Sequence, residues 1–144
     1  MDLRMKELAR GYIASGQFNG YRAPQHLQNQ IVKLYCDINN LEFVLSRAEY
    51  WINGNSKCQL WASLEEGFKH IVFFSIWQLP VDIVERQKIF DHCLKERITL
   101  HFAQEQMRTG LDKNSYGDLE MLIKTYLMIM KSDNDHLDLL HELL

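Results

Sequence analysis

The sequence predicts an α/β protein with a mostly parallel sheet of four to five strands flanked by helices. Segments rich in β-forming residues alternate along the chain with segments of helical periodicity. The segment HIVFFSIW at 70–77 has no polar alternation, as expected of a strand buried on both faces. Both prolines, Pro24 and Pro80, precede periodic segments, as at the first position of a helix. We therefore expect three layers, right-handed crossovers and a long C-terminal helix.

The first predicted helix follows a short strand and a polar loop. The strand starts near Leu8 and breaks at residues 14–16, and the helix opens at Pro24. Apolar residues then recur at helical spacing. They are Leu27, Ile31, Leu34 and Ile38. From this spacing we expect Leu27 and Ile31 to face the core.

The remaining elements alternate in the same way. Further strands are predicted at 41–45, 70–77 and 98–103, and further helices at 57–66, 81–95 and 118–131. The polar segment 104–114 is predicted to be a loop. The apolar face of the 118–131 helix is wider than one sheet face needs, which predicts an oligomer interface over about 118–144, in the simplest case a homodimer. Residues 1–144 are predicted to form a single domain.

Composition limits the partners and the compartment. A hydrophobic fraction of 47% and a charged fraction of 24% are typical of a soluble globular domain. The net charge of −3 supplies no basic surface for a phosphate backbone, so we expect no nucleic acid as a partner. The three cysteines are widely spaced, and no apolar run is long enough for a bilayer. These features predict a cytoplasmic protein without membrane insertion.

Standard cofactor and metal motifs are missing from the sequence. It contains no G-x-G-x-x-G, no P-loop, no H-E-x-x-H and no Cys/His cluster. We therefore expect neither a cofactor nor a metal.

The candidate catalytic residues follow the predicted strands. Parallel strands end at one edge of a sheet, so side chains that follow different strands meet there. Ser15 follows the first strand and is a candidate nucleophile or ligand contact, with a turn serine as the alternative. Glu49 and Glu105 follow later strands and are candidates for general acid and base, with surface salt bridges as the alternative.

The candidate ligand-binding residues are arginines and amides near the same edge. Arg22 precedes the helix, where backbone N–H groups and the helix dipole favour an anion. Arg10, inside the first strand, would add a second cation or form a strand-end salt bridge. Uncharged amides both donate and accept, which suits hydroxyl-rich ligands, and a solvated helix face is their alternative. These amides are Asn19, Gln25, Gln28, Asn29 and Gln78.

Two resemblances add to this prediction. A strand, an S-x-Q loop and a helix, followed by HIVFFSIWQLPVDIVERQKIF and ITLHFAQE, resemble the catalytic domain of resolvase-type serine recombinases over roughly 8–130. We accordingly expect a flavodoxin-like or resolvase-like three-layer sandwich, and the resemblance places Ser15 at the nucleophile's position. Ile13 stands where that family has an arginine, and Gln78-Leu79-Pro80 replaces arginines after the central strand. These departures imply that DNA strand exchange is not retained.

The second resemblance runs through most of the chain and is most specific in the phrase FNGYRAPQHLQNQ, at the first helix and the loop before it. RGYIASGQFNGYRAPQHLQNQIVKLYC, with QLP later, is similar to a family of small proteins from sporadically distributed bacterial carbohydrate clusters, which build surface polysaccharides such as capsule or O-antigen. The resemblance implies a protein of this biosynthesis that binds or modifies a sugar, sugar phosphate or nucleotide sugar. The alternatives are a non-catalytic module that docks on a pathway enzyme and a degenerate serine-recombinase-like domain.

Overall fold

The computed structural model describes residues 5–16, 22–50 and 57–143, with side chains described up to residue 132. Two compact units are distinguished, Met1–Leu111 and Asp112–Leu144. The first contains the whole sheet, and the second contains one helix. That the two form a single domain stays a prediction.

The sheet has five strands in the order β2-β1-β3-β4-β5. They are β1 (Glu7–Ala14), β2 (Leu41–Glu49), β3 (His70–Phe73), β4 (Thr99–Phe102) and β5 (Met107–Arg108). The first four are parallel, which confirms the predicted mostly parallel sheet. β5 pairs antiparallel with β4 inside the segment predicted to be a loop. The chain reverses there because Gln106 adopts a left-handed conformation and its N–H bonds the Ala103 carbonyl at 3.2 Å.

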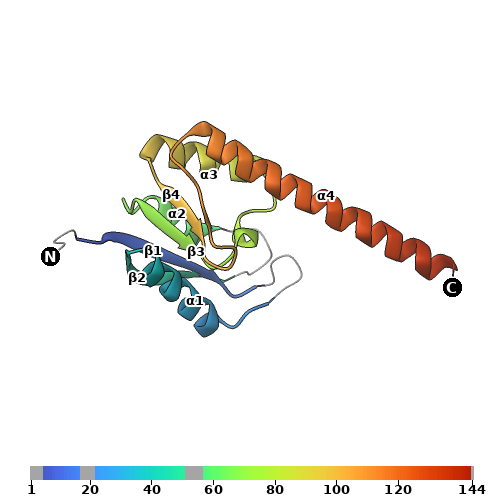
Figure 1. Ribbon diagram of the computed structural model, residues 1–144, viewed down its shortest axis with the longest axis horizontal. Coiled ribbons are helices and arrows are strands. Elements are labelled where there is room, and N and C mark those ends of the chain that lie inside the picture. The colour runs from blue at the N-terminus through green and yellow to red at the C-terminus, as the bar shows by residue number, and fades with distance from the viewer. Residues whose placement is uncertain (1–4, 17–21, 51–56, 144) are drawn as a thin grey trace. The chain divides into compact units, whose positions relative to one another are not determined.

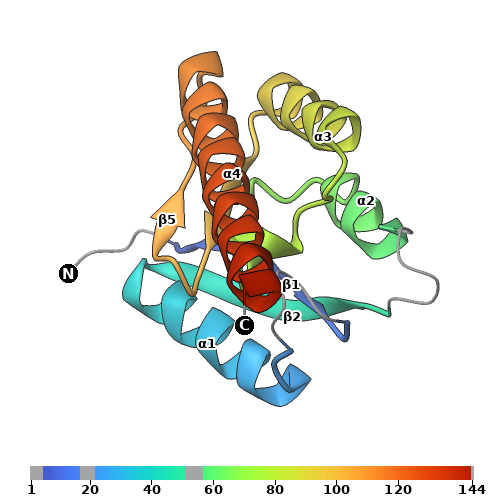
Figure 2. The same ribbon diagram turned by 90° about the vertical axis from the view of Figure 1, so that its right-hand side faces the viewer.

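Helices cover both faces of this sheet. They are α1 (Gln25–Ile38), α2 (Cys58–Leu64) and α3 (Ile83–Glu96), with a single 3₁₀ turn, η1 (Ile76–Gln78), after β3. α1 lies on one face, and α2 and α3 lie on the other (Figures 1 and 2). The predicted three-layer α/β fold is confirmed.

The central strand β3 is shorter than the apolar run 70–77 predicts. Ser75 ends the strand because its hydroxyl accepts the Trp77 N–H at 3.2 Å, while the Gln78 side chain accepts the Ser75 N–H at 3.3 Å. This reciprocal cap starts η1 instead of a further pair of strand residues. The turn places Gln78 at the end of β3, where it reaches the edge of the sheet.

The two faces of the sheet carry different cores. Tyr12, Phe73 and Phe102 lie opposite one another on β1, β3 and β4, with ring centroids 5.0 and 5.3 Å apart. The other face carries a cluster of smaller side chains that packs against α1. Its buried members include Ala9, Ile13, Val72, Val32, Tyr35 and Cys36. Alternation along each strand separates the two cores.

α1 does not bury the stripe that its hydrophobic spacing predicts. Its buried residues are Gln28, Val32, Tyr35 and Cys36. Leu34 is 58% exposed and Ile38 is 74% exposed, and Leu27 is also exposed. The expectation that Leu27 faces the core is therefore wrong, and Ile31 is only partly buried. The helix turns its other stripe inward because Gln28 finds hydrogen-bond partners at the end of β1.

The second unit is a single helix, α4 (Lys113–Leu143), which is longer than the predicted 118–131 and confirms the long C-terminal helix. Met121, Met128 and Ile129 are exposed along it. That 118–144 forms an oligomer interface stays a prediction. Within the described part of the chain, no helix combines the length and the apolar character needed to cross a bilayer.

Candidate functional site

The carboxyl edge of the sheet brings several of the predicted site residues together. The Ser15 N–H donates to the Glu49 carbonyl at 2.9 Å, which joins the ends of β1 and β2. The Arg22 Nε donates to the Ser15 carbonyl at 3.4 Å from the segment before α1. This is the geometry expected of parallel strands that stop at a shared edge.

Gln28 and Gln78 meet at the centre of this edge, and both are fully buried. The Gln28 Nε2 donates to the carbonyls of Ala14 at 2.7 Å and Ala23 at 2.8 Å. Its Oε1 accepts from the Ala14 N–H at 3.1 Å and from the Gln78 Nε2 at 2.8 Å. The Gln28 amide thus uses two donors and two acceptors on the protein itself, and this is the full capacity of the group.

Glu49 is buried at the start of α2. Its carboxylate accepts the Gln59 N–H at 3.0 and 3.2 Å and the Leu60 N–H at 3.4 Å. The Tyr12 hydroxyl donates to it at 3.3 Å, and burial together with this carboxylate raises the pKa of the Tyr12 phenol. A carboxylate at a helix N-terminus satisfies free N–H groups and complements the helix dipole.

Glu105 performs a similar task at the start of η1. Its two carboxylate oxygens accept the Ser75 hydroxyl at 2.9 Å and the Ile76 N–H at 2.7 Å. Burial raises the pKa of Glu105, and these two donors oppose the rise. Glu49 and Glu105 therefore both bind the chain's own backbone near the edge.

Three other predicted residues do not join this cluster, and a fourth is not among the described residues. Arg10 donates to the Leu45 carbonyl at 2.6 Å and to the Glu66 carboxylate at 2.8 Å, so it lies along the sheet and not at its edge. Asn29 lines a separate hollow of about 330 Å³ beside β2. Gln25 opens α1 and is partly buried. Asn19 lies outside the described residues.

The surroundings of Ser15 limit what the edge does chemically. The Ser15 hydroxyl donates to the Glu49 carbonyl oxygen at 3.3 Å. A serine nucleophile needs a base that takes its proton, and a carbonyl oxygen does not act as one. The edge is thus a hydrogen-bonded junction in which the side chains of Glu49, Glu105, Gln28 and Gln78 bond protein groups. That Ser15, Glu49 and Glu105 are catalytic stays a prediction.

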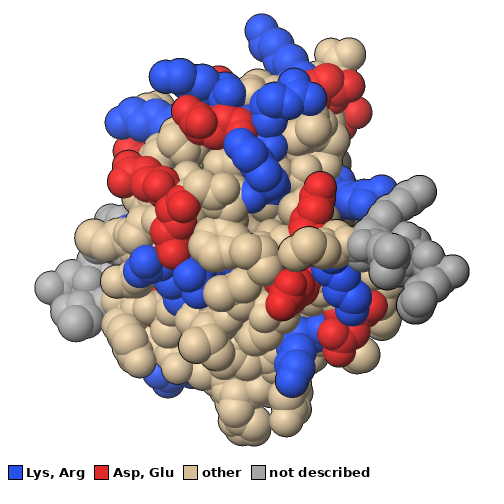
Figure 3. Space-filling view, turned by 90° about the vertical axis from the view of Figure 1, so that its left-hand side faces the viewer, with Lys and Arg blue, Asp and Glu red and all other residues tan. Residues whose placement is uncertain are grey.

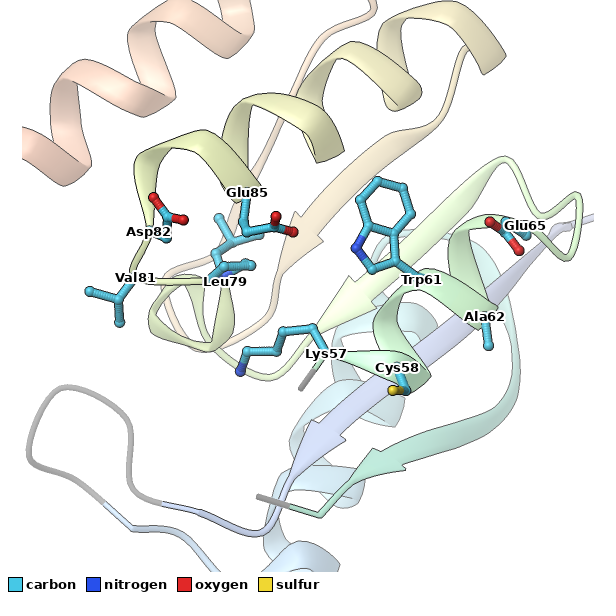
Figure 4. A pocket seen from close by; sticks show the side chains of 10 residues that line it. Lys57, Cys58, Trp61, Ala62, Glu65, Leu79, Val81, Asp82 and Glu85 are labelled. Atoms are coloured by element: carbon cyan, nitrogen blue, oxygen red, sulfur yellow. The ribbon is translucent and has the colours of Figure 1, made fainter. Parts of the chain in front are cut away.

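A pocket of about 770 Å³ lies close to this junction, between α2 and the segment that joins η1 to α3. Lys57 and Trp61 line it from the α2 side, and Leu79, Asp82 and Glu85 line it from the other side. Figure 4 shows the Trp61 indole and the Glu85 carboxylate directed toward one another across the gap. This pocket was not predicted.

The pocket walls are held by bonds behind them. The buried Arg86 donates to the carbonyls of Pro80 at 3.1 Å and Val81 at 2.6 Å. Asp82 caps α3 by accepting the Val84 N–H at 3.0 Å. Trp61 packs edge-on against His92, with ring centroids 5.8 Å apart. These contacts fix the backbone and the Trp61 ring that form the walls.

Its charge is mixed, with an excess of carboxylates. Glu65, Asp82 and Glu85 supply three acidic groups and Lys57 supplies one amine. Burial lowers the pKa of Lys57 to about 8, and the Glu49 carboxylate opposes this shift. The pocket therefore combines hydrogen-bond acceptors, one titrating donor and an aromatic ring.

Sequence reasoning missed this pocket because its two walls are distant in the chain and neither carries a recognisable motif. The signal that was available is indirect. Val81 and Asp82 follow Pro80 at a predicted helix start, and Trp61 is a large aromatic residue on a short helix. Neither observation identifies the other wall.

Comparison with solved structures identifies proteins that share this fold. No family model matches the chain, and no curated protein matches its sequence significantly. Among solved structures, it is similar to a resolvase family site-specific recombinase from Streptococcus pneumoniae, with a TM-score of 0.64 and 12% identity over 91% of this chain and 95% of that one. The fold is that of resolvase-type catalytic domains. The N-terminal catalytic domain of TP901-1 integrase is also similar, with a TM-score of 0.59 and 11% identity over 85% of this chain and 97% of that one.

This likeness corrects one prediction. The exclusion of nucleic acid as a partner was wrong, because a site-specific recombinase acts on DNA and the chain shares the fold of one. A net charge of −3 is a sum over the chain and does not describe any one surface. On the face in Figure 3, lysine and arginine side chains lie among aspartates and glutamates. The resemblance to a carbohydrate-cluster family stays a prediction.

Proposed function

We propose that this chain is a degenerate recombinase-like domain that binds a small molecule and does not cleave DNA strands. The observation that carries the proposal is the internal bonding of the sheet edge. Gln28, Glu49 and Glu105 direct their side chains to backbone groups of the chain, and Ser15 bonds a carbonyl. An enzyme that attacks a phosphodiester would instead need these groups directed toward the substrate.

The pocket beside this edge is the proposed binding site. Its volume of about 770 Å³ falls in the range of small-molecule sites. Three carboxylates disfavour a phosphorylated ligand, because like charges repel. They accept O–H or N–H groups, and the Trp61 ring packs on an apolar face. The proposed ligand is therefore an uncharged or cationic molecule with several donors and one apolar face.

Sugars without phosphate have this chemistry, which connects the pocket to the carbohydrate-cluster resemblance. A role in surface-polysaccharide biosynthesis rests on that resemblance alone and stays a prediction. Organic amines have the same donors with a positive charge. A comparison of the affinities for neutral sugars and for amines distinguishes the two ligand classes.

The binding test measures, by NMR or calorimetry, the affinity of the protein for each member of a panel of neutral sugars, amino sugars, polyamines and sugar phosphates. We expect binding by a donor-rich member of the panel and a loss of about tenfold or more in Glu85→Gln and Trp61→Leu. Glu96→Gln, on the same helix α3 but outside the pocket, is the matched control and should bind as the wild type does. Equal affinity in all three variants would place the ligand elsewhere.

Loss of strand cleavage is tested separately, by incubating the chain with supercoiled and linear DNA and searching for a covalent protein–DNA adduct by denaturing electrophoresis. We expect no adduct, and Ser15→Ala should behave as the wild type does. An adduct that disappears in Ser15→Ala would show that the hydroxyl is an active nucleophile and would overturn the proposal.

A further inference from the structure

A third hollow lies on the face of the sheet opposite to the pocket beside α2, between α1 and the β4–β5 turn, with a volume of about 410 Å³. We refer to it as the α1 groove. Ile31, Leu34 and Ile38 form its apolar side, and Leu34 and Ile38 belong to the exposed stripe of α1. Tyr35 and Arg108 also line it. Among the described residues that line the α1 groove, Arg108 alone carries a charge.

The α1 groove connects to a chain of hydrogen-bonded titratable groups that crosses the sheet. The Tyr35 hydroxyl lies 2.7 Å from His101 Nδ1, and His101 Nε2 lies 2.9 Å from His70 Nδ1. His70 Nε2 in turn bonds the Glu7 carboxylate. Tyr35 and His101 are buried, whereas the Glu7 side chain is 72% exposed. This series of hydrogen bonds from Glu7 to Tyr35, which we call the relay, therefore runs from solvent to a side chain that lines the α1 groove.

Each of these hydrogen bonds carries one proton, and the protonation of His70 determines the direction of two of them, His70–His101 and His101–Tyr35; the bond to Glu7 runs from His70 in both states. When His70 is neutral, its Nε2–H donates to the Glu7 carboxylate, which only accepts. Its Nδ1 then has to accept a proton from His101 Nε2–H. This leaves His101 Nδ1 without a proton, and the Tyr35 hydroxyl donates to it.

Protonation of His70 reverses this direction. Both nitrogens of a protonated histidine donate, so His70 Nδ1–H donates to His101 Nε2. His101 stays neutral because burial and the charges of His70 and Arg108 lower its pKa to about 3. Its proton then lies on Nδ1 and donates to the Tyr35 oxygen. The Tyr35 O–H then has to turn away from His101 and is free to donate to another acceptor; Tyr35 lines the α1 groove.

We infer that the α1 groove binds a small carboxylic acid with an apolar body, and that protonation of His70 strengthens this binding by releasing the Tyr35 hydroxyl as a donor. The apolar body lies on Ile31, Leu34 and Ile38. The carboxylate pairs with Arg108, the only charge among the described lining residues, and accepts from Tyr35 when His70 is charged. This site is independent of the pocket beside α2.

Other charged or titratable groups near the relay raise or lower the pKa values of its members. Arg108 opposes the rise that burial produces in the pKa of Tyr35, and Cys36 adds to that rise. Burial, with Asp37, raises the pKa of the Cys36 thiol to about 11, so the thiol stays neutral below that pH. Lys69, which precedes His70, donates to the Glu96 carbonyl at 2.9 Å. The charged groups at the two ends of the relay are therefore Glu7, at the exposed end, and Arg108, at the α1 groove.

The binding arm of the test follows hexanoate by NMR titration at pH 6 and pH 8, where carboxylic acids stay ionised and histidine changes its charge. We expect binding about tenfold tighter at pH 6, the value of one hydrogen bond to a charged group. Hexanamide should bind at least about tenfold more weakly, as should hexanoate to Arg108→Gln, whereas Arg97→Gln is the matched exposed control. Unchanged binding in Arg108→Gln would overturn the site.

The relay arm reads the histidine tautomers directly in long-range ¹H–¹⁵N spectra. We expect the His101 proton on Nε2 at pH 8 and on Nδ1 at pH 6. The exposed substitution Glu7→Gln replaces a carboxylate that only accepts by an amide that also donates, so the His101 proton should no longer be confined to Nε2 at pH 8. A His101 tautomer that is the same at both pH values would overturn the coupling.

Discussion

The carboxyl edge of the sheet and the pocket beside α2 use similar residues in opposite ways. Glu49 at the edge bonds two backbone N–H groups at the start of α2. Glu85 in the pocket is directed toward Trp61 across an open space (Figure 4). The difference lies in the backbone nearby. Strand ends and helix starts leave N–H and C=O groups without partners, and polar side chains next to them bond these groups first.

The edge and the pocket should also differ in their contributions to the free energy of unfolding. A carboxylate that satisfies buried N–H groups stabilises the fold, because its removal leaves donors without partners. A charged group that lines a pocket loses hydration with less compensation. The edge should therefore contribute to stability and the pocket should lower it, which is the usual relation between a structural site and a binding site.

The strongest test of this contrast is Glu49→Ala. We expect a loss of about 3 kcal/mol in the free energy of unfolding, because the Gln59 and Leu60 N–H groups and the Tyr12 hydroxyl lose their acceptor. Urea unfolding followed by circular dichroism measures it. Glu42→Ala, at an exposed position of the same strand, should change stability by less than about 0.5 kcal/mol. Equal effects would remove the distinction between edge and surface.

Lys57→Met, in contrast, should raise the free energy of unfolding at pH 7. Burial holds the pKa of Lys57 at about 8 in the folded state against the ordinary 10.5, so the folded protein binds fewer protons than the unfolded chain between these values. Wild-type stability should therefore rise from pH 8 to pH 10.5. At pH 7 the variant should be more stable by about 2 kcal/mol, after allowance for residual solvation.

The measurement for Lys57 is urea unfolding at several pH values. In Lys57→Met the rise between pH 8 and pH 10.5 should be absent. Lys95→Met, at an exposed position near the end of α3, is the control and should keep the rise. A variant that is less stable than the wild type at pH 7 would show that the ammonium contributes to the fold.

The smallest stability effect is expected for Glu85→Gln. Glu85 is partly exposed and pairs with the exposed Lys88 at 3.2 Å, and such pairs contribute little. We expect a change within about 0.5 kcal/mol in the free energy of unfolding, while ligand binding in the pocket falls. A large loss of stability here would make the pocket resemble the edge and break the comparison.

The sheet was predictable because its signals are local. The alternation of strand and helix patterns and the apolar run 70–77 both depend on neighbours in the chain, and they led to the observed parallel strands. The end of β3 was not predictable from hydropathy, because the Ser75 cap depends on a hydroxyl and an amide bonding backbone groups. β5 was missed because two residues carry too little periodicity to be recognised.

The inward face of α1 shows the limit of hydrophobic spacing. Two stripes of the helix have acceptable spacing, and the more apolar one was expected in the core. The structure buries the stripe of Gln28 and Tyr35 because both polar groups find buried partners, at Ala14 and at His101. Pairings of this kind join residues that are distant in the chain, and a single sequence does not reveal them.

The candidate site was half predictable for the same reason. Shared strand direction correctly brings Ser15, Glu49 and Gln78 to one edge, since topology alone determines it. Whether a side chain there faces solvent or backbone depends on which helix starts are nearby. The function of the residues at this edge therefore remains a prediction that the substitutions above decide.

The anchoring of Gln28 has a mechanical consequence for α1. Its amide is hydrogen-bonded to the Ala23 carbonyl shortly before the helix, to Ala14 at the end of β1 and to the Gln78 side chain after β3. Rolling the helix about its axis to hide Leu34 and Ile38 would break all of these ties at once. The aliphatic row is consequently held outward, where it stays available for contact, as long as α1 keeps these bonds to the sheet.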